Sequence, residues 1–269
     1  MTILEQHPGL LDALRGEMTP KFLATRSASG MPNVVPCTSI QPADDHQGDL
    51  GQPDTVFFGN FLLRKSIKNL NEDTRVGILV VTPELRGWIL QCDFVEIQRT
   101  GAYVDKQMSG SLLRYNAYTG IRDAGILRVR SIVGTFAISK LQVMTDFLRA
   151  RFAGAGEFTS AGVTMPRQVQ SEFAKMVAVK VLARLGGDGY PIVVPALSLQ
   201  PRSAQTLACY LSPQLPRPPT GAPVATNILT FEAISYQAKG KWDIRGNTGK
   251  IRVQEIYAGG PPLPGERIA

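Results

Sequence analysis

The alternation of apolar and polar residues predicts a mainly β protein with a few flanking helices. Runs rich in β-branched and aromatic residues, separated by Gly, Pro and Asn, are typical of strands joined by turns. Strands are expected at 22–27, 33–40, 55–58, 75–81, 88–99 and 127–136. Apolar residues three and four positions apart predict short helices, at 8–18 and 106–118.

The chain also contains an internal repeat. Residues 23–42 and 182–201 align at a constant offset (182 − 23 = 159) with 10 identities in 20 positions, where unrelated segments would share about one or two. Two later pairs extend the repeat: 98–101 with 237–240, and 128–132 with 252–256. One module has therefore been duplicated and fused, which predicts two similar antiparallel barrels in tandem.

The stretch 55–71 combines a strand, a sharp turn and a short helix. Gly59 and Asn60 end the strand, and apolar residues at helical spacing follow. Three polar residues fall in the first helical turn: Arg64, Lys65 and Ser66. Free backbone N–H groups and the helix dipole favour an anion there, so the pattern predicts a phosphate site. The alternative is an amphipathic helix with a solvated basic face.

The second half lacks this helix. Its corresponding segment, 212–223, has five prolines in twelve residues and Arg217 as its one cation, and prolines at that density prevent a helix. The predicted domains are a barrel at 1–138, a helical linker at 139–163 and a degenerate barrel at 164–269. One phosphate site, in the first half, is expected.

Composition excludes several classes of protein. The chain has 269 residues, 43% of them hydrophobic and 19% charged, which is enough to bury a core and argues against disorder. The net charge of +7 comes from scattered Lys and Arg with no nucleic-acid motif, so no nucleic-acid partner is expected. No apolar run is long enough for a bilayer, and residues 1–11 do not resemble a signal peptide.

Cysteine and histidine use points to a protein without disulfides or a metal. The three cysteines lie in apolar strands, as reduced core thiols of a cytoplasmic protein do. The two histidines, His7 and His46, give no support for a catalytic triad or a metal site. Asp44, Asp45 and His46 are expected to form a solvated turn, with metal binding as the less favoured alternative.

Three stretches together resemble one known family. Residues 58–66 are similar to the flavin-phosphate segment of the pyridoxamine 5'-phosphate oxidase-like FMN-binding split barrels. Residues 23–40 resemble that family's first hairpin, and 94–103 resemble a later strand that ends in Gly. The similarity covers roughly residues 10–138. The fold it implies, with the repeat, is two tandem split β-barrels.

The resemblance also implies a ligand and a site. The ligand is FMN, bound by a flavoprotein oxidoreductase that uses a small-molecule substrate and an electron donor. The implied cofactor-binding residues are Val35, Pro36, Cys37, Thr38, Phe58, Gly59, Asn60, Arg64, Lys65, Ser66 and Gln98. For Cys37 the alternative is a packed strand residue. Members of this family usually form the flavin site between two barrels, so either the second barrel supplies the partner surface or two chains pair.

The resemblance is also compatible with other functions. Relatives of this type include deazaflavin-dependent reductases and haem-binding proteins, so a deazaflavin reductase, or a non-catalytic flavin or haem carrier or sensor, is the alternative. Vitamin B6 oxidation is not expected, because the tail at 261–269 has no counterpart of the C-terminal Trp and Arg elements of that enzyme.

Overall fold

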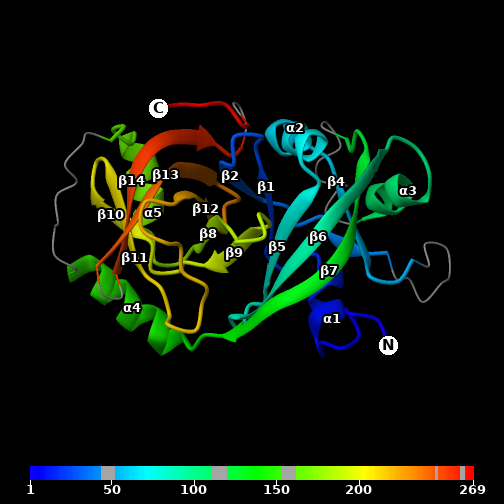
Figure 1. The fold of residues 1–269 in the computed structure, drawn as a ribbon, viewed down its shortest axis with the longest axis horizontal. Coiled ribbons are helices and arrows are strands. Elements are labelled where there is room, and N and C mark those ends of the chain that lie inside the picture. The colour runs from blue at the N-terminus through cyan, green and yellow to red at the C-terminus, as the bar shows by residue number, and fades with distance from the viewer. Residues whose placement is uncertain (44–51, 111–119, 153–161, 246–247, 261–263) are drawn as a thin grey trace.

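The computed structural model describes residues 1–43, 52–110, 120–152, 162–245, 248–260 and 264–269. Within them the chain forms two seven-stranded antiparallel sheets, one from each half, with short helices around them (Figure 1). The segment with Asp44, Asp45 and His46 lies outside the described residues. Among the described residues, no helix is long and apolar enough to span a membrane.

The first sheet runs in the order β2-β1-β5-β6-β7-β4-β3. Its strands are β1 (Lys21–Arg26), β2 (Pro32–Pro36), β3 (Gln41–Pro42), β4 (Thr55–Gly59), β5 (Arg75–Val81), β6 (Arg86–Gln98) and β7 (Ala124–Ala137). The strand expected at 33–40 is shorter than predicted. It ends at Pro36, because the Ile40 N–H donates to the Cys37 carbonyl and closes a turn.

The second sheet runs in the order β10-β11-β14-β13-β12-β8-β9. Its strands are β8 (Val179–Leu185), β9 (Pro191–Pro195), β10 (Gln200–Ser203), β11 (Thr206–Tyr210), β12 (Pro223–Leu229), β13 (Ser235–Arg245) and β14 (Thr248–Ala258). When β8 to β14 are matched in sequence order with β1 to β7, the two sheets have the same strand order. The chain is two tandem split-barrel-like domains, as the repeat predicted.

Strand register confirms the duplication residue by residue. Leu23 pairs with Val35 in the first half, and Leu182 pairs with Val194 in the second, each pair at the predicted offset of 159. The match of 128–132 with 252–256 is confirmed as well. Cys92 of β6 pairs with Val129, and Gly240, which holds the equivalent position in β13, pairs with Val253.

The predicted match of Gly101 with Gly240 is wrong. Gly240 lies inside β13 and pairs with Val224, whereas Gly101 follows β6 and precedes a helix. Cys92, which pairs with Val76, occupies the position equivalent to Gly240. A bulge beside Gly240 and the longer β6 of the first half shift the two strands, so identical letters at a fixed spacing misled the alignment.

Five short helices connect and cover the sheets in the described residues: α1 (Leu10–Arg15), α2 (Arg64–Glu72), α3 (Ala102–Ser109), α4 (Lys140–Phe152) and α5 (Arg167–Ala174). The helix expected at 106–118 begins earlier, at Ala102, and residues 111–119 lie outside the described residues. Between β11 and β12 there is no helix, as the prolines predicted. The duplicated modules therefore differ where α2 stands.

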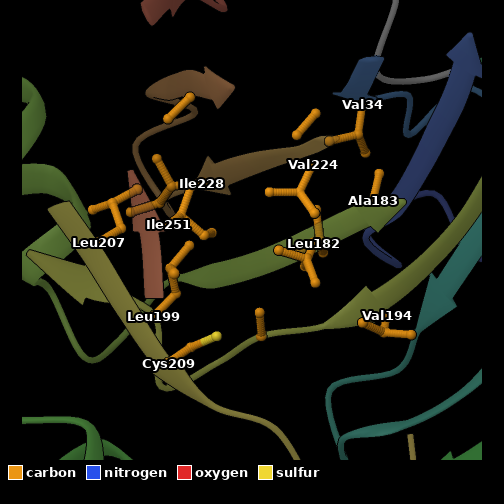
Figure 2. Close-up of a cluster of buried hydrophobic side chains, with 14 of the residues drawn as sticks. Val34, Leu182, Ala183, Val194, Leu199, Leu207, Cys209, Val224, Ile228 and Ile251 are labelled. Atoms are coloured by element: carbon orange, nitrogen blue, oxygen red, sulfur yellow. The ribbon is translucent and has the colours of Figure 1, made fainter. Parts of the chain in front are cut away.

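The two halves share one hydrophobic core. Phe22, Val34 and Ile89 of the first half belong to the same buried cluster as most of the second-half core, and Figure 2 shows Val34 beside Val224. The backbones also approach closely, since a Cβ on Gly77 would lie 2.2 Å from the Pro191 carbonyl oxygen. The two halves therefore pack directly against each other.

Polar contacts hold the same interface. Arg26 donates to the Gly189 carbonyl at 3.1 Å, and Arg75 donates to the Asp188 carbonyl at 3.1 Å. The Asp188 carboxylate accepts a further bond from Gln91 at 2.9 Å. These first-half side chains all reach the turn between β8 and β9, so the relative position of the halves is set by directional bonds as well as by apolar packing.

Replacing Phe22 with Ala should lower the free energy of unfolding by about 3–5 kcal/mol, because loss of a buried ring leaves a cavity in the shared core. Phe22 is 0% exposed and Phe231 is 85% exposed, so Phe231→Ala should change stability by less than about 0.5 kcal/mol. Urea unfolding followed by circular dichroism measures both variants. Equal losses would contradict this account of the core.

Candidate functional site

A cleft of about 250 Å³ lies between the two halves. The first half lines it with Asn33, Val35, Pro36, Cys37, Thr38, Ser39, Gly59, Phe61, Leu62, Leu63, Lys65 and Ser66. The second half lines it with Asn227, Leu229, Ala233, Ser235, Gln237, Tyr257, Ala258, Gly259, Pro264 and Gly265. The walls are thus the end of β2 and the start of α2 on one side, and one end of β12, β13 and β14 on the other.

Hydrogen bonds fix the first-half wall. The Ser39 hydroxyl accepts from the Gly59 N–H at 3.2 Å and lies 3.3 Å from the Gly59 carbonyl, to which it donates. This ties the turn after β2 to the end of β4. The Asn60 side chain accepts from the Leu63 N–H at 3.2 Å, which orders the turn that leads into α2.

Two buried amides hold α2 against the sheet. Asn33 of β2 donates to the Ser66 hydroxyl at 3.2 Å, and Asn69 donates to the Thr25 hydroxyl at 2.9 Å. Because both contacts are buried, they fix the rotation of the helix. That rotation turns Ser66 towards β2 and leaves Arg64 exposed.

Seven of the eleven predicted site residues line the cleft: Val35, Pro36, Cys37, Thr38, Gly59, Lys65 and Ser66. They come from β2 and the turn after it, the end of β4 and the first turn of α2, which are the segments that the sequence predicted. The structure brings them together at one surface. Whether they bind a flavin stays a prediction.

Four predicted site residues lie elsewhere. Phe58 points into the first-half core and is fully buried, because side chains alternate along β4. Asn60 orders the start of α2, and Arg64 is exposed on the outer side of the helix. Gln98 donates to Glu96 at 2.7 Å on the exposed end of β6. Arg64, Lys65 and Ser66 therefore do not converge on one point.

Lys65 instead crosses to the second half. Its ammonium group lies 3.6 Å from the centroid of the Tyr257 ring, a cation–π contact. Tyr257 in turn donates to Glu255 at 2.8 Å, and burial raises its pKa to about 12. The start of α2 is thus joined to β14.

Sequence reasoning missed the second-half wall. Asn227 is 0% exposed and lines the cleft, with its Nδ2 donor lacking a partner among the described residues. Gln237 also lines the cleft and donates to the Val34 carbonyl. The second half had lost the phosphate helix, so no local pattern marked these residues. The Nδ2 group of Asn227 is therefore a buried donor in the cleft wall whose hydrogen-bonding capacity is unused among the described residues.

The second half contains a position equivalent to the first-half wall of the cleft, but side chains occupy the space in front of it. Pro195, Leu197, Ser198 and Tyr210 are equivalent to Pro36, Thr38, Ser39 and Gly59. Ser198 bonds both backbone groups of Tyr210 at 2.9 Å, as Ser39 bonds Gly59. Here, however, α4 lies against β10 and β11 (Figure 1). Its side chains leave a cavity of only about 20 Å³.

The described lining residues of the main cleft include no Asp, Glu or His. Among the described residues, no group of three or more His, Cys, Asp or Glu side chains is placed to hold a metal ion. What the cleft presents is apolar surface, backbone groups, neutral hydrogen-bonding side chains and one cation. This set can hold an organic ligand with an anionic end but offers no acid–base pair of its own.

A scan against protein-family models matched none, and a search of curated proteins returned no match. Solved structures do match, each over about half of this chain. An FMN-binding protein from Syntrophomonas wolfei subsp. wolfei aligns at 14% identity over 51% of this chain and 88% of its own, with TM-score 0.40.

Two further structures align over similar lengths. A putative pyridoxamine 5'-phosphate oxidase from Lactobacillus delbrueckii shares 13% identity over 48% of this chain and 93% of its own, with TM-score 0.36. An F420 reductase shares 20% identity over 45% and 93%, with TM-score 0.34. Each of these three structures is aligned over most of its own length.

The cysteines give a direct test of the described packing. All three are buried and free, and burial raises the pKa of Cys37 and of Cys209 to about 12. A raised pKa keeps a thiol neutral below that pH, and the thiolate is the reactive form. At about pH 8 we expect no reaction with Ellman's reagent in native protein and reaction of every cysteine in guanidinium chloride. Rapid labelling of native Cys37 would contradict its burial.

Proposed function

We propose that this protein is a flavoprotein oxidoreductase that binds FMN in the cleft between its halves. The observation that carries the proposal is the cleft itself. It is built from the strand and helix start that resemble the FMN-binding split barrels, and Lys65 and Ser66 stand at its wall. The second half takes the place that a partner barrel has in that family. A small-molecule substrate and an electron donor would meet the flavin there.

The residues present fit such a ligand. Val35, Pro36, Leu63 and Leu229 supply apolar surface for a planar ring system, and aromatic rings favour such surfaces. The orphan Nδ2 of Asn227 supplies a buried donor for a ring or side-chain oxygen. Lys65 and Ser66 supply a cation and a hydroxyl for a phosphate.

The residues that line the cleft decide which functions the chain supplies and which the cofactor supplies. FMN, when bound, supplies the electron-transfer chemistry. The chain binds and orients the ligand and excludes water from the apolar part of the cleft. Cys37 does not act as a base, because burial raises its thiol pKa to about 12. The reaction therefore relies on the cofactor and on groups of the substrate.

The proposal predicts one FMN per chain. The equivalent position in the second half is filled by α4 and lacks the α2 helix, so it should take no flavin. Titration of apoprotein with FMN, followed by visible absorbance and flavin fluorescence, should saturate at one equivalent. Two equally tight sites, or no binding and no flavin colour in the purified protein, would contradict the proposal.

Lys65→Ala should weaken FMN binding by about one to two orders of magnitude, since a hydrogen bond to a charged group contributes about 1.5–3 kcal/mol. Ser66→Ala should weaken it less, because a neutral donor is lost. Arg64→Ala is the matched control, since Arg64 is exposed outside the cleft, and should bind FMN nearly as the parent does.

Riboflavin separates loss of a phosphate contact from damage to the fold. It lacks the phosphate, so it should bind the parent and Lys65→Ala protein weakly and nearly equally. Isothermal titration calorimetry measures each dissociation constant. If a folded Lys65→Ala protein binds FMN as tightly as the parent, α2 does not bind the phosphate and is only a basic amphipathic helix. That result would contradict the proposal.

A further inference from the structure

Two lysines from different halves lie close to each other beside the cleft. Lys65 lies on α2 of the first half, and Lys239 lies on β13 of the second. Their ammonium groups lie 3.6 Å and 5.5 Å from the centroid of the Tyr257 ring, and the two side chains interact with each other. Tyr257 lines the cleft together with Lys65. The cluster therefore adjoins the cleft and contains side chains from both halves.

The surrounding charges leave this cluster positive. Glu255 is the cross-strand partner of Lys239 and, within the part of the chain that the structure describes, the one carboxylate that faces the pair. Its oxygens are already engaged, because Tyr257 donates to it at 2.8 Å and Arg267 lies 3.6 Å away in an ion pair. Lys68, on the same helix as Lys65, adds a further positive charge. Lys68 itself pairs with Glu72 at 3.9 Å, so Glu255 is left between Lys65, Lys239 and Arg267.

The burial of Lys239 next to a second cation costs free energy of folding. Its side chain is only 2% exposed, and a buried ammonium group needs acceptors. Buried lysines differ in this protein: the Lys21 ammonium donates to the Gly16 carbonyl at 2.8 Å and the Thr38 carbonyl at 3.2 Å, whereas the Lys180 ammonium has no hydrogen-bond partner among the described residues. The Lys239 ammonium lies beside Lys65 and the Tyr257 ring. Burial, and then the charge of Lys65, lowers its pKa to about 7.

We infer that Lys65 and Lys239 together form an anion subsite that binds the phosphate group of the ligand held in the cleft. An anion between them would turn the repulsion of two ammonium groups into two charge-assisted contacts. This inference rests on the proposed FMN function for the identity of the ligand, and it makes the second half a supplier of a phosphate-binding residue. The phosphate is thus bridged across the two halves.

Lys239→Met tests the subsite, because methionine keeps an unbranched apolar side chain at a buried position. The variant should bind FMN about ten- to a hundredfold more weakly than the parent, the loss expected for one charge-assisted bond. Riboflavin binding should be unchanged. Lys241→Met is the matched control, since Lys241 lies on the same strand but is exposed, and should bind FMN as the parent does.

Inorganic phosphate separates this inference from the proposed function. If FMN binds the parent and Lys239→Met protein equally, the subsite is wrong while the proposed function stands. If the parent binds phosphate but not FMN, and Lys239→Met abolishes phosphate binding, the subsite stands and the proposed function fails. If the parent binds neither ligand, both fail. Calorimetry on the full chain gives all of these outcomes, and unchanged riboflavin binding or near-ultraviolet circular dichroism shows that the variant is folded.

The subsite also predicts a pH dependence. Anion binding favours the protonated form of Lys239, whose pKa in the free protein is lowered to about 7. Between about pH 7 and 9, where a phosphate monoester is already a dianion, FMN affinity of the parent should fall by up to about tenfold per pH unit. The other facing groups are Lys65, Lys68, Glu255, Tyr257 and Arg267. A parent profile as flat as that of Lys239→Met would overturn the inference.

Discussion

The arrangement of this molecule depends on the apolar core that its two halves share. Phe22, Val34 and Ile89 are buried among second-half residues, and Gly77 allows the two backbones to approach. Because that burial is available only when the halves meet, the same packing that stabilises the chain also sets the cleft walls at a fixed separation. Both halves of the chain therefore line the cleft.

Duplication followed by divergence accounts for the difference between the two ends of this interface. Strand order and register are the same in both halves, and Ser198 holds Tyr210 as Ser39 holds Gly59. On one side α2 and the end of β2 leave a cleft. On the other, prolines prevent the helix and α4 packs into the space. Retaining the strands preserves the shared core, whereas the connecting segments were free to change.

Two buried polar groups, one in the cleft wall and one beside the cleft, lower the stability of the described structure. Asn227 keeps a buried donor without a partner, and Lys239 is buried beside another cation. Lys21 is also buried, but it donates to two carbonyls. A buried donor without a partner beside a cleft is a group that a bound ligand can satisfy.

Sequence alone determined the features that depend on local periodicity: the strands, the repeat, the helix after Gly59 and its loss in the second half. It also located the first-half wall, because β2 and α2 carry recognisable short patterns. Tertiary structure decided that Arg64 and Gln98 lie outside the cleft and that Cys92 is the counterpart of Gly240. It also placed Asn227 in the cleft wall and Lys239 beside Lys65. Helix rotation, strand bulges and the packing of one half against the other set which side chains meet, and residues more than a hundred positions apart leave no local signal of that meeting.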